Sequence, residues 1–253
     1  MRRAVGSGVR SPGKGCSAAR CRDNQLQPRD SAYVLSTQHH YRVHLMKGWD
    51  WSKFKGSQAC LKWARRNLEA LEKTLPLVSA RKACVQAGGN LGIFPKWLAQ
   101  YFEIVYTFEP EQELHKLLKL NAPENNILCM NAALGDTTEP VRMACTRRDD
   151  SGRAVHEGLT HVAGPGNVPC LRLDDLRLNE CNLLYLDIEG WEYRALIGAR
   201  ETIDRCRPVI GVEINKNISY TGRSGDELRK LIISHGYQLA LTVQSDEIYT
   251  PAF

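Results

Sequence analysis

The pattern of apolar and polar positions predicts alternating strands and helices from residue 83 onward. Five short apolar runs indicate buried strands at residues 83–87, 104–108, 127–131, 183–188 and 209–214. Segments with helical spacing follow at residues 93–102, 111–121, 191–206 and 225–235. Residues 237–243 and 247–249 predict a closing antiparallel pair. Short connections between strands and helices favour an α/β fold, in which helices cover both faces of a mostly parallel sheet.

Three further segments define the domain organisation. Residues 1–45 lack apolar periodicity and predict a basic, disordered tail, whereas residues 46–253 predict one folded domain. Within that domain, residues 46–80 carry apolar side chains at roughly helical spacing and predict N-terminal helices. Residues 135–180 are rich in glycine and proline and predict an inserted hairpin with loops.

The net positive charge of the chain is confined to this tail. The 253 residues carry a net charge of +6, and residues 1–45 hold eight basic and two acidic residues, so the remainder is neutral. We therefore expect the folded part not to require nucleic acid as a partner. The first 22 residues contain no acid, as in an organelle transit peptide, and Met46 is an alternative start of the chain.

Hydropathy and cysteine usage predict a cytoplasmic protein. No apolar run approaches the roughly 18–20 residues needed to span a bilayer, so we expect no membrane span. The nine cysteines are scattered without a C-x-x-C pair, which is typical of reduced thiols.

A glycine-rich turn follows the first predicted strand. Gly88, Gly89 and Gly92 lie where that strand must turn sharply into a helix. Glycine allows positive φ angles and has no Cβ to block a ligand that approaches the backbone. Because ligands of open parallel sheets bind at the carboxyl ends of the strands, this turn predicts a nucleotide-like ligand.

Glu109 ends the second predicted strand, 17 positions after Gly92. A carboxylate there can accept hydrogen bonds from both hydroxyls of a ribose. The turn does not follow the G-x-G-x-x-G pattern that holds a pyrophosphate, so a nucleoside such as S-adenosylmethionine fits better than a nicotinamide dinucleotide. The alternative role for Glu109 is to stabilise the N-terminus of the next helix.

Asn131 ends the third predicted strand, and Ala132 follows it. In this architecture the turn there lies under an adenine, so Asn131 or a backbone group could bond the edge of the base. The alternative is a turn built simply from small residues.

Three acids mark the ends of later strands. Asp187 and Glu189 end one strand, and Glu213 ends the next. Carboxylates at adjacent strand ends repel one another unless a positive charge compensates them. The candidates are a cation, the sulfonium of S-adenosylmethionine and basic groups of residues 135–170. A divalent cation would suit oxygen ligands, but we expect the sulfonium rather than a metal cofactor.

Several motifs together resemble the FkbM-type methyltransferases in order and spacing. The motifs are residues 85–92, Phe108-Glu109-Pro110, Leu173-Asp174-Asp175-Leu176, residues 186–192 and the run from Leu196 through Pro208 to Glu213. They extend over roughly residues 80–215. The resemblance implies a class I methyltransferase fold, which is Rossmann-like with a seven-stranded sheet, and S-adenosylmethionine as cofactor.

The resemblance also implies roles for individual residues. It places the methionine end of the cofactor near Gly88 and Asn90, the ribose at Glu109, and functional acids at Asp187, Glu189 and Glu192. Gln86 stands where the family usually has an acid near the cofactor's amino group. Its amide oxygen can still accept a hydrogen bond, but without the charge, so weaker cofactor binding and loss of catalysis are open alternatives.

Methyl transfer from a sulfonium requires an acceptor held in line with the methyl group and a group that takes a proton. The candidate bases are Asp187, Glu189 and Glu213, with His156 and His161 of the predicted insert as alternatives.

Only the resemblance indicates which kind of molecule accepts the methyl group. FkbM-type enzymes mostly methylate hydroxyls on sugars or secondary metabolites, which implies O-methylation of a sugar, glycan or small metabolite. A methyltransferase for protein or nucleic acid, recruited by the basic tail, is the second hypothesis. A non-catalytic nucleoside-binding module is the third, and a nicotinamide dehydrogenase fits least.

Overall fold

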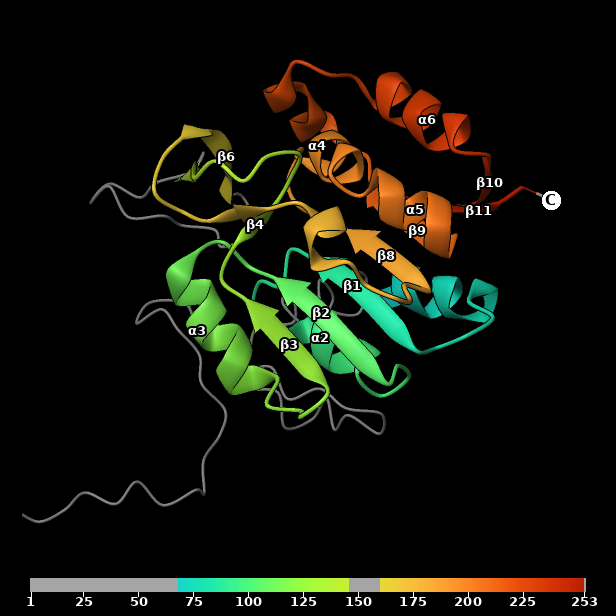
Figure 1. Cartoon of the computed structure of the whole chain (residues 1–253), viewed down its shortest axis with the longest axis horizontal. Helices are drawn as coiled ribbons and strands as arrows, with labels where there is room; N and C mark the ends of the chain where they lie inside the picture. The colour runs from blue at the N-terminus through green and yellow to red at the C-terminus, as the bar shows by residue number, and fades with distance from the viewer. Residues whose placement is uncertain (1–67, 146–159, 253) are drawn as a thin grey trace, which may run out of the picture. The chain divides into compact units, whose positions relative to one another are not determined.

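The structure of the chain, a computed structural model, describes residues 68–145 and 160–252 (Figure 1). The predicted basic tail, much of the predicted N-terminal helical segment and His156 lie outside these residues. Residues 68–74 are helical, and no helix in the described ranges is long and apolar enough to cross a membrane.

Seven strands form one sheet in the order β10-β11-β9-β8-β1-β2-β3. Its parallel strands are β1 (Ala83–Ala87), β2 (Ile104–Phe108), β3 (Ile127–Met130), β8 (Leu183–Leu186) and β9 (Val209–Glu213). The hairpin of β10 (Tyr237–Val243) and β11 (Asp246–Pro251) closes the sheet, with β11 antiparallel to β9. The predicted fold is confirmed. β1 and β8 are buried along their whole length, as their central places in the sheet require.

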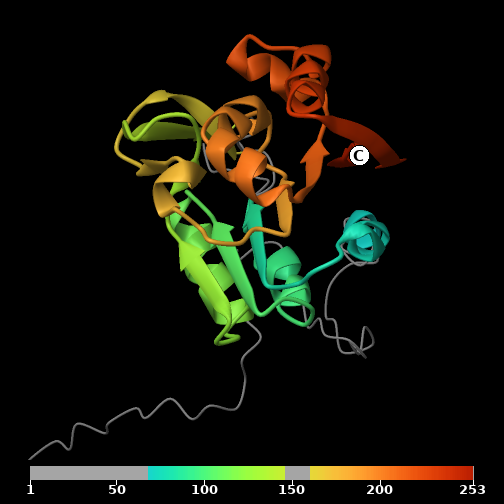
Figure 2. The ribbon, with the colours of Figure 1, turned by 45° about the vertical axis from the view of Figure 1, so that its right-hand side comes forward.

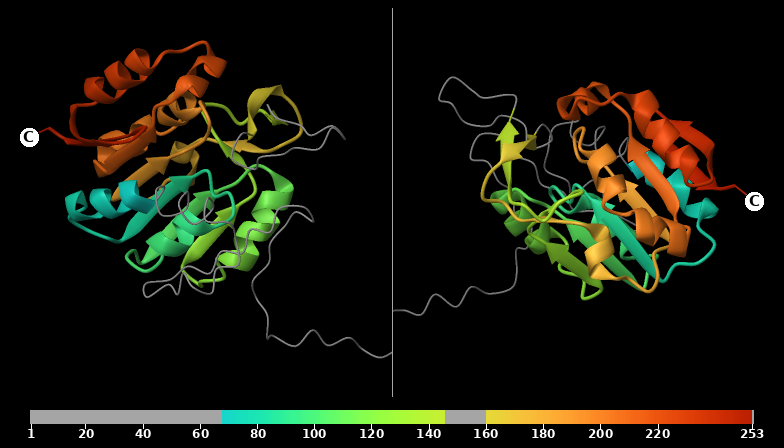
Figure 3. Two further views of the ribbon diagram at one scale, coloured as in Figure 1. Left: turned by 180° about the vertical axis from the view of Figure 1, so that it is seen from behind. Right: turned by 45° about the horizontal axis from the view of Figure 1, so that its top comes forward.

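Helices cover both faces of this sheet (Figures 2 and 3). They are η2 (Leu75–Leu77), α2 (Ile93–Leu98), α3 (Gln112–Asn121), α4 (Glu192–Ile197), α5 (Arg200–Cys206), η5 (Lys216–Thr221) and α6 (Gly225–Ser234). One apolar cluster contains α2 and residues 68–78, and a second contains α4, α5 and α6. β1 contributes Cys84 to the first cluster and Val85 to the second, because successive side chains of a strand point to opposite faces.

Two helices differ from their predicted extents. The helix predicted over residues 191–206 is two helices, α4 and α5. The chain between them passes close to Gly135, since a Cβ on Gly198 would lie 1.9 Å from the Gly135 carbonyl oxygen. The helix predicted over residues 93–102 ends at Leu98, and the turn that follows returns Phe102 to the core.

The chain between β3 and β8 adds two small ladders instead of an α-helix in its described part. β4 (Ala133–Leu134) pairs parallel with β7 (Cys170–Leu171), and β5 (Val141–Cys145) pairs antiparallel with β6 (Thr160–Pro165). A short 3₁₀ helix, η4 (Leu173–Leu176), then leads toward β8.

Asp174 of η4 ties this segment to the start of α5. Its Oδ1 accepts hydrogen bonds from the backbone N–H and the hydroxyl of Thr202, at 2.9 and 2.8 Å, and its Oδ2 accepts from the Glu201 N–H at 3.1 Å. The residue that precedes α5, Ala199, has no side chain that could cap the helix. Asp174 therefore satisfies donors that the helix itself leaves unpaired.

Replacing Asp174 with alanine should lower the free energy of unfolding by about 1–2 kcal/mol, because the first N–H groups of α5 lose a charged acceptor. The matched control is Asp175→Ala, which removes only an exposed ion pair with Arg172 worth roughly 0–1 kcal/mol. Urea denaturation measures both changes. Equal losses in the two variants would contradict the capping role.

Candidate functional site

A cavity of about 320 Å³ lies at the carboxyl ends of the parallel strands. Residues that end or follow β1, β2, β8 and β9 line it, together with the turn between β10 and β11. The β5–β6 hairpin contributes Met143, Thr160 and Val162. These segments meet because parallel strands all end at the same edge of the sheet.

The glycine turn after β1 is anchored to the end of β2. The N–H groups of Gly88 and Gly89 both donate to the carbonyl oxygen of Phe108, at 3.0 and 2.9 Å. Gly88 has a φ of 87°, and a Cβ there would lie 1.8 Å from the carbonyl oxygen of Asp187. Only glycine fits this position, because the turn passes this close to the residue that follows β8. The backbone of the turn also lines the cavity.

Glu109 lies beside that turn, with 5% of its surface exposed. Its Oε2 accepts a hydrogen bond from the Asn90 N–H at 2.7 Å, and its Oε1 accepts from the Glu111 N–H at 2.9 Å. Burial raises the pKa of Glu109 to about 7, although the two backbone donors favour the charged form. Because each carboxylate oxygen can accept more than one hydrogen bond, Glu109 can still bind hydroxyls of a ligand in the cavity.

Gln86 is completely buried behind the turn and does not line the cavity. Its Oε1 accepts from the Thr107 hydroxyl at 2.7 Å, and its Nε2 donates to the carbonyl oxygens of Ala87 and Gly88, at 3.0 and 2.9 Å. The side chain therefore supports the turn from inside the sheet. Gln86 thus lies behind the cavity lining, where the resemblance implied a place near the cofactor's amino group.

The residues after β3 that line the cavity lie two positions further along the chain than predicted. Asn131 donates through Nδ2 to the carbonyl oxygens of Glu109 and Pro110, at 2.9 and 3.2 Å. Asn131 and Ala132 do not line the cavity, whereas Ala133 and Leu134 do. Asn131 thus joins the ends of β2 and β3.

His161 does not line the cavity either. It lies between Thr160 and Val162 on β6, and those two neighbours face the cavity while the His161 ring stacks on Tyr220, with centroids 4.3 Å apart. Alternation along the strand explains this orientation. It argues against His161 as the base.

The predicted acids converge as expected. Asp187, Glu189 and Glu213 all line the cavity, and each offers a carboxylate oxygen within 4.8 Å of the others. Asn217 donates to Glu189 at 2.5 Å, and Asn215 donates to Glu213 at 2.6 Å. The spacing could hold a divalent cation, but carboxylates with amide donors also cluster without one, and we propose no metal.

Asp246 is a fourth acid beside Asp187, Glu189 and Glu213, and the sequence did not single it out. It begins β11, opposite Glu213 in the antiparallel register, and it lines the cavity. Burial raises the pKa of Asp246 to about 6 and that of Glu189 to about 7. Burial also raises the pKa of Asp187, and the charge of Glu213 raises it further.

Glu192 holds the loop that carries Asp187 and Glu189. It is 1% exposed, and its Oε1 accepts hydrogen bonds from the N–H groups of Ile188 and Gly190, at 3.0 and 3.2 Å. These two hydrogen bonds help to hold the backbone of Glu189 at a φ of 53°, in the left-handed region that residues other than glycine rarely adopt. Glu192 does not line the cavity, so the structure gives it a supporting position.

The fold defines the class of protein. A seven-stranded, mostly parallel sheet closed by an antiparallel hairpin is the class I methyltransferase fold that the resemblance implied. The methyltransferase FkbM domain matches residues 90–239, which is more than half of the chain. The protein belongs to the FkbM methyltransferase domain family.

Two solved structures resemble the chain at low sequence identity. Methyltransferase FkbM from Methylobacillus flagellatus KT is 20% identical, with a TM-score of 0.45, and the match covers 68% of this chain but only 43% of that one. Magnesium protoporphyrin IX methyltransferase from Synechocystis PCC 6803 is 10% identical over 76% of this chain and 82% of that one, also with a TM-score of 0.45. Comparison with curated proteins gives no match.

The buried acids predict an unusual pH dependence of stability. The pKa of Glu192 is raised by burial from its ordinary 4.5 to about 8, and that of Glu109 to about 7. Between pH 4.5 and about 8 the folded protein thus holds more protons than the unfolded chain. The stability of the ligand-free protein should therefore fall as the pH rises through this window.

Urea denaturation between pH 5 and pH 8 tests this expectation. Glu192→Gln keeps an oxygen that can accept the two backbone hydrogen bonds but removes the charge, so it should flatten the decline. Glu113→Gln, on the exposed side of α3, is the control and should leave the slope unchanged. A wild-type stability that rises across the window would show that the acids are not held in this environment.

Proposed function

We propose that this protein transfers a methyl group from S-adenosylmethionine to a hydroxyl of a sugar, glycan or small metabolite. The observation that carries the proposal is the buried carboxylate of Glu109, fixed by the Asn90 N–H beside the bare backbone of Gly88. A fixed carboxylate beside an open turn suits the hydroxyls of a ribose. No lysine, arginine or histidine is among the described residues that line the cavity, which disfavours a pyrophosphate ligand.

The strand order divides the cavity into two halves. We assign the nucleoside to the half formed by the ends of β1 and β2, with Gly88, Asn90 and Glu109, and by Ala133 and Leu134 of β4 beside the base. The ends of β8, β9 and β11 form the acceptor half, where the four carboxylates lie. A methyl group between the halves would face those acids.

The acceptor half suits a hydroxyl, because carboxylates accept its hydrogen bond and then its proton. When bound, S-adenosylmethionine supplies an electrophilic methyl group. The acids would hold the acceptor oxygen in line with this methyl group. Their pKa values, raised to near neutral pH, match the requirement for a general base.

The location that we propose for the protein is the cytoplasm. The free, buried thiols of Cys84 and Cys181 support it.

Calorimetry on the full chain should detect binding of S-adenosylmethionine and S-adenosylhomocysteine. Glu109→Ala should weaken both affinities roughly tenfold or more, because hydrogen bonds to a charged group are worth about 1.5–3 kcal/mol. Glu113→Ala on α3 is the matched control and should bind like the wild type. Thermal melts establish that each variant is folded. A wild type that binds neither ligand at millimolar concentration would refute the proposal.

The acceptor class is tested with S-adenosylmethionine that carries a labelled methyl group. We expect label transfer to hydroxyls in a panel of sugars and oligosaccharides, and none to protein or nucleic acid from a cell extract. If the cofactor binds but the label appears only on protein or nucleic acid, the proposed acceptor class is overturned. The proposal of methyl transfer then still stands.

A further inference from the structure

Asp246 differs from the other acids of the cavity in how its position is set. It comes from the β10–β11 hairpin, outside the residues that match the FkbM domain. The hydroxyl of Tyr185 donates to its Oδ1 at 2.8 Å. Tyr185 lies on β8, so a residue of the central sheet orients a side chain of the terminal hairpin.

The ring of Tyr185 cannot move away from this contact. The residue is fully buried, and its ring packs edge-on against Phe94 with centroids 5.8 Å apart. Gly211 on β9 leaves room for the other side of the ring, since a Cβ there would lie 2.4 Å from the Tyr185 ring carbon Cδ2. The hydroxyl therefore has a fixed position, and it fixes one oxygen of Asp246.

The remaining oxygen of Asp246 has no hydrogen bond within the described part of the chain, and the residue lines the cavity. Among the neighbouring acids Glu213 is more fully engaged, whereas Glu189, like Asp246, accepts one hydrogen bond. Glu213 accepts from Asn215 at 2.6 Å and from the Ser245 hydroxyl at 3.1 Å. Glu189 accepts from Asn217 at 2.5 Å. Asp187 lies against Glu213, so those two carboxyl groups compete for one proton.

We propose that Asp246 is the base of the methyl transfer and that Tyr185 is the residue that positions it. The proposal rests on the proposed function. Oδ2 of Asp246 takes the proton of the acceptor hydroxyl while an oxygen lone pair forms the new bond to the methyl carbon. The carbon–sulfur bond breaks with its electron pair on sulfur, which leaves the methyl ether, a neutral thioether and protonated Asp246.

The surroundings of Asp246 suit this role near neutral pH. Burial raises its pKa to about 6, the charge of Glu213 contributes to the rise, and the Tyr185 hydroxyl opposes it. Asp187 also lines this part of the cavity. Asp246 is therefore an available base above about pH 6, and loss of the Tyr185 hydroxyl should raise its pKa.

Carbon-13 NMR of the side-chain carboxyl groups tests the positioning role without an acceptor. The full chain saturated with S-adenosylhomocysteine is titrated, and Asp246→Asn assigns the signal. We expect Asp246 to titrate near pH 6, and Tyr185→Phe to move that midpoint up by roughly one pH unit. An unmoved midpoint in Tyr185→Phe would overturn the positioning role.

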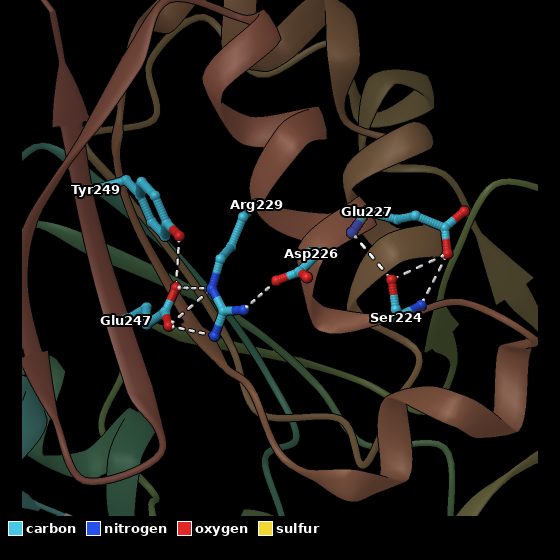
Figure 4. Close-up of polar contacts among 6 residues, drawn as sticks. All are labelled: Ser224, Asp226, Glu227, Arg229, Glu247 and Tyr249. Carbon is cyan, nitrogen blue, oxygen red and sulfur yellow. Dashed lines mark hydrogen bonds and ion pairs between the residues drawn. The ribbon is translucent and has the colours of Figure 1, made fainter.

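Tyr249→Phe is the matched control. Tyr249 is also buried, and its hydroxyl also donates to a carboxylate of β11, but that carboxylate is Glu247, which Arg229 binds outside the cavity (Figure 4). This variant removes the same kind of hydrogen bond from the same hairpin. It should leave the Asp246 midpoint unchanged, and an equal shift would mean that the effect reflects general loosening of the hairpin.

Label transfer to the sugar that accepts the methyl group tests the catalytic role. Asp246→Asn should lower kcat about 100-fold or more at an unchanged affinity for S-adenosylhomocysteine. In Tyr185→Phe, the acidic limb of the pH–rate profile should move upward with the NMR midpoint. Full kcat in Asp246→Asn would overturn the proposal, whereas failure of the wild type to bind S-adenosylhomocysteine would refute the proposed function itself.

Discussion

The join between the glycine turn and the end of β2 determines the geometry of the site. Two backbone N–H groups of the turn share the carbonyl oxygen of Phe108, and the next residue, Glu109, accepts from the Asn90 N–H of the same turn. Gln86 supports the turn from behind through the Thr107 hydroxyl on β2. A loop that would otherwise be adaptable is thus tied to the neighbouring strand, so its bare backbone is ready for a ligand before one binds.

The half of the cavity that we assign to the acceptor has the opposite character. Its carboxyl groups are partly buried and close together, which costs stability above their ordinary pKa values. Amide and hydroxyl donors from Asn217, Asn215 and Ser245 offset part of that cost. Groups with shifted pKa values concentrate at functional sites, because chemistry near neutral pH needs them there.

Supporting residues occupy several positions that the family resemblance links to function. Gln86 and Glu192 both lie behind the cavity and hold backbone N–H or carbonyl groups of the loops that line it. Asp174, from another shared motif, caps α5 and does not line the cavity. Motifs of this family therefore record the construction of the loops as well as contacts with ligands.

The sequence by itself determined the sheet, the glycine turn at its edge and the convergence of the first three acids. Unbroken apolar runs specify buried parallel strands, and residues at the ends of such strands must meet at one edge. Only the tertiary structure decided which side chains reach the cavity. Strand alternation turns His161 away between Thr160 and Val162, and antiparallel pairing brings Asp246 opposite Glu213. These outcomes depend on register between distant segments, and register is set by packing that no local pattern records.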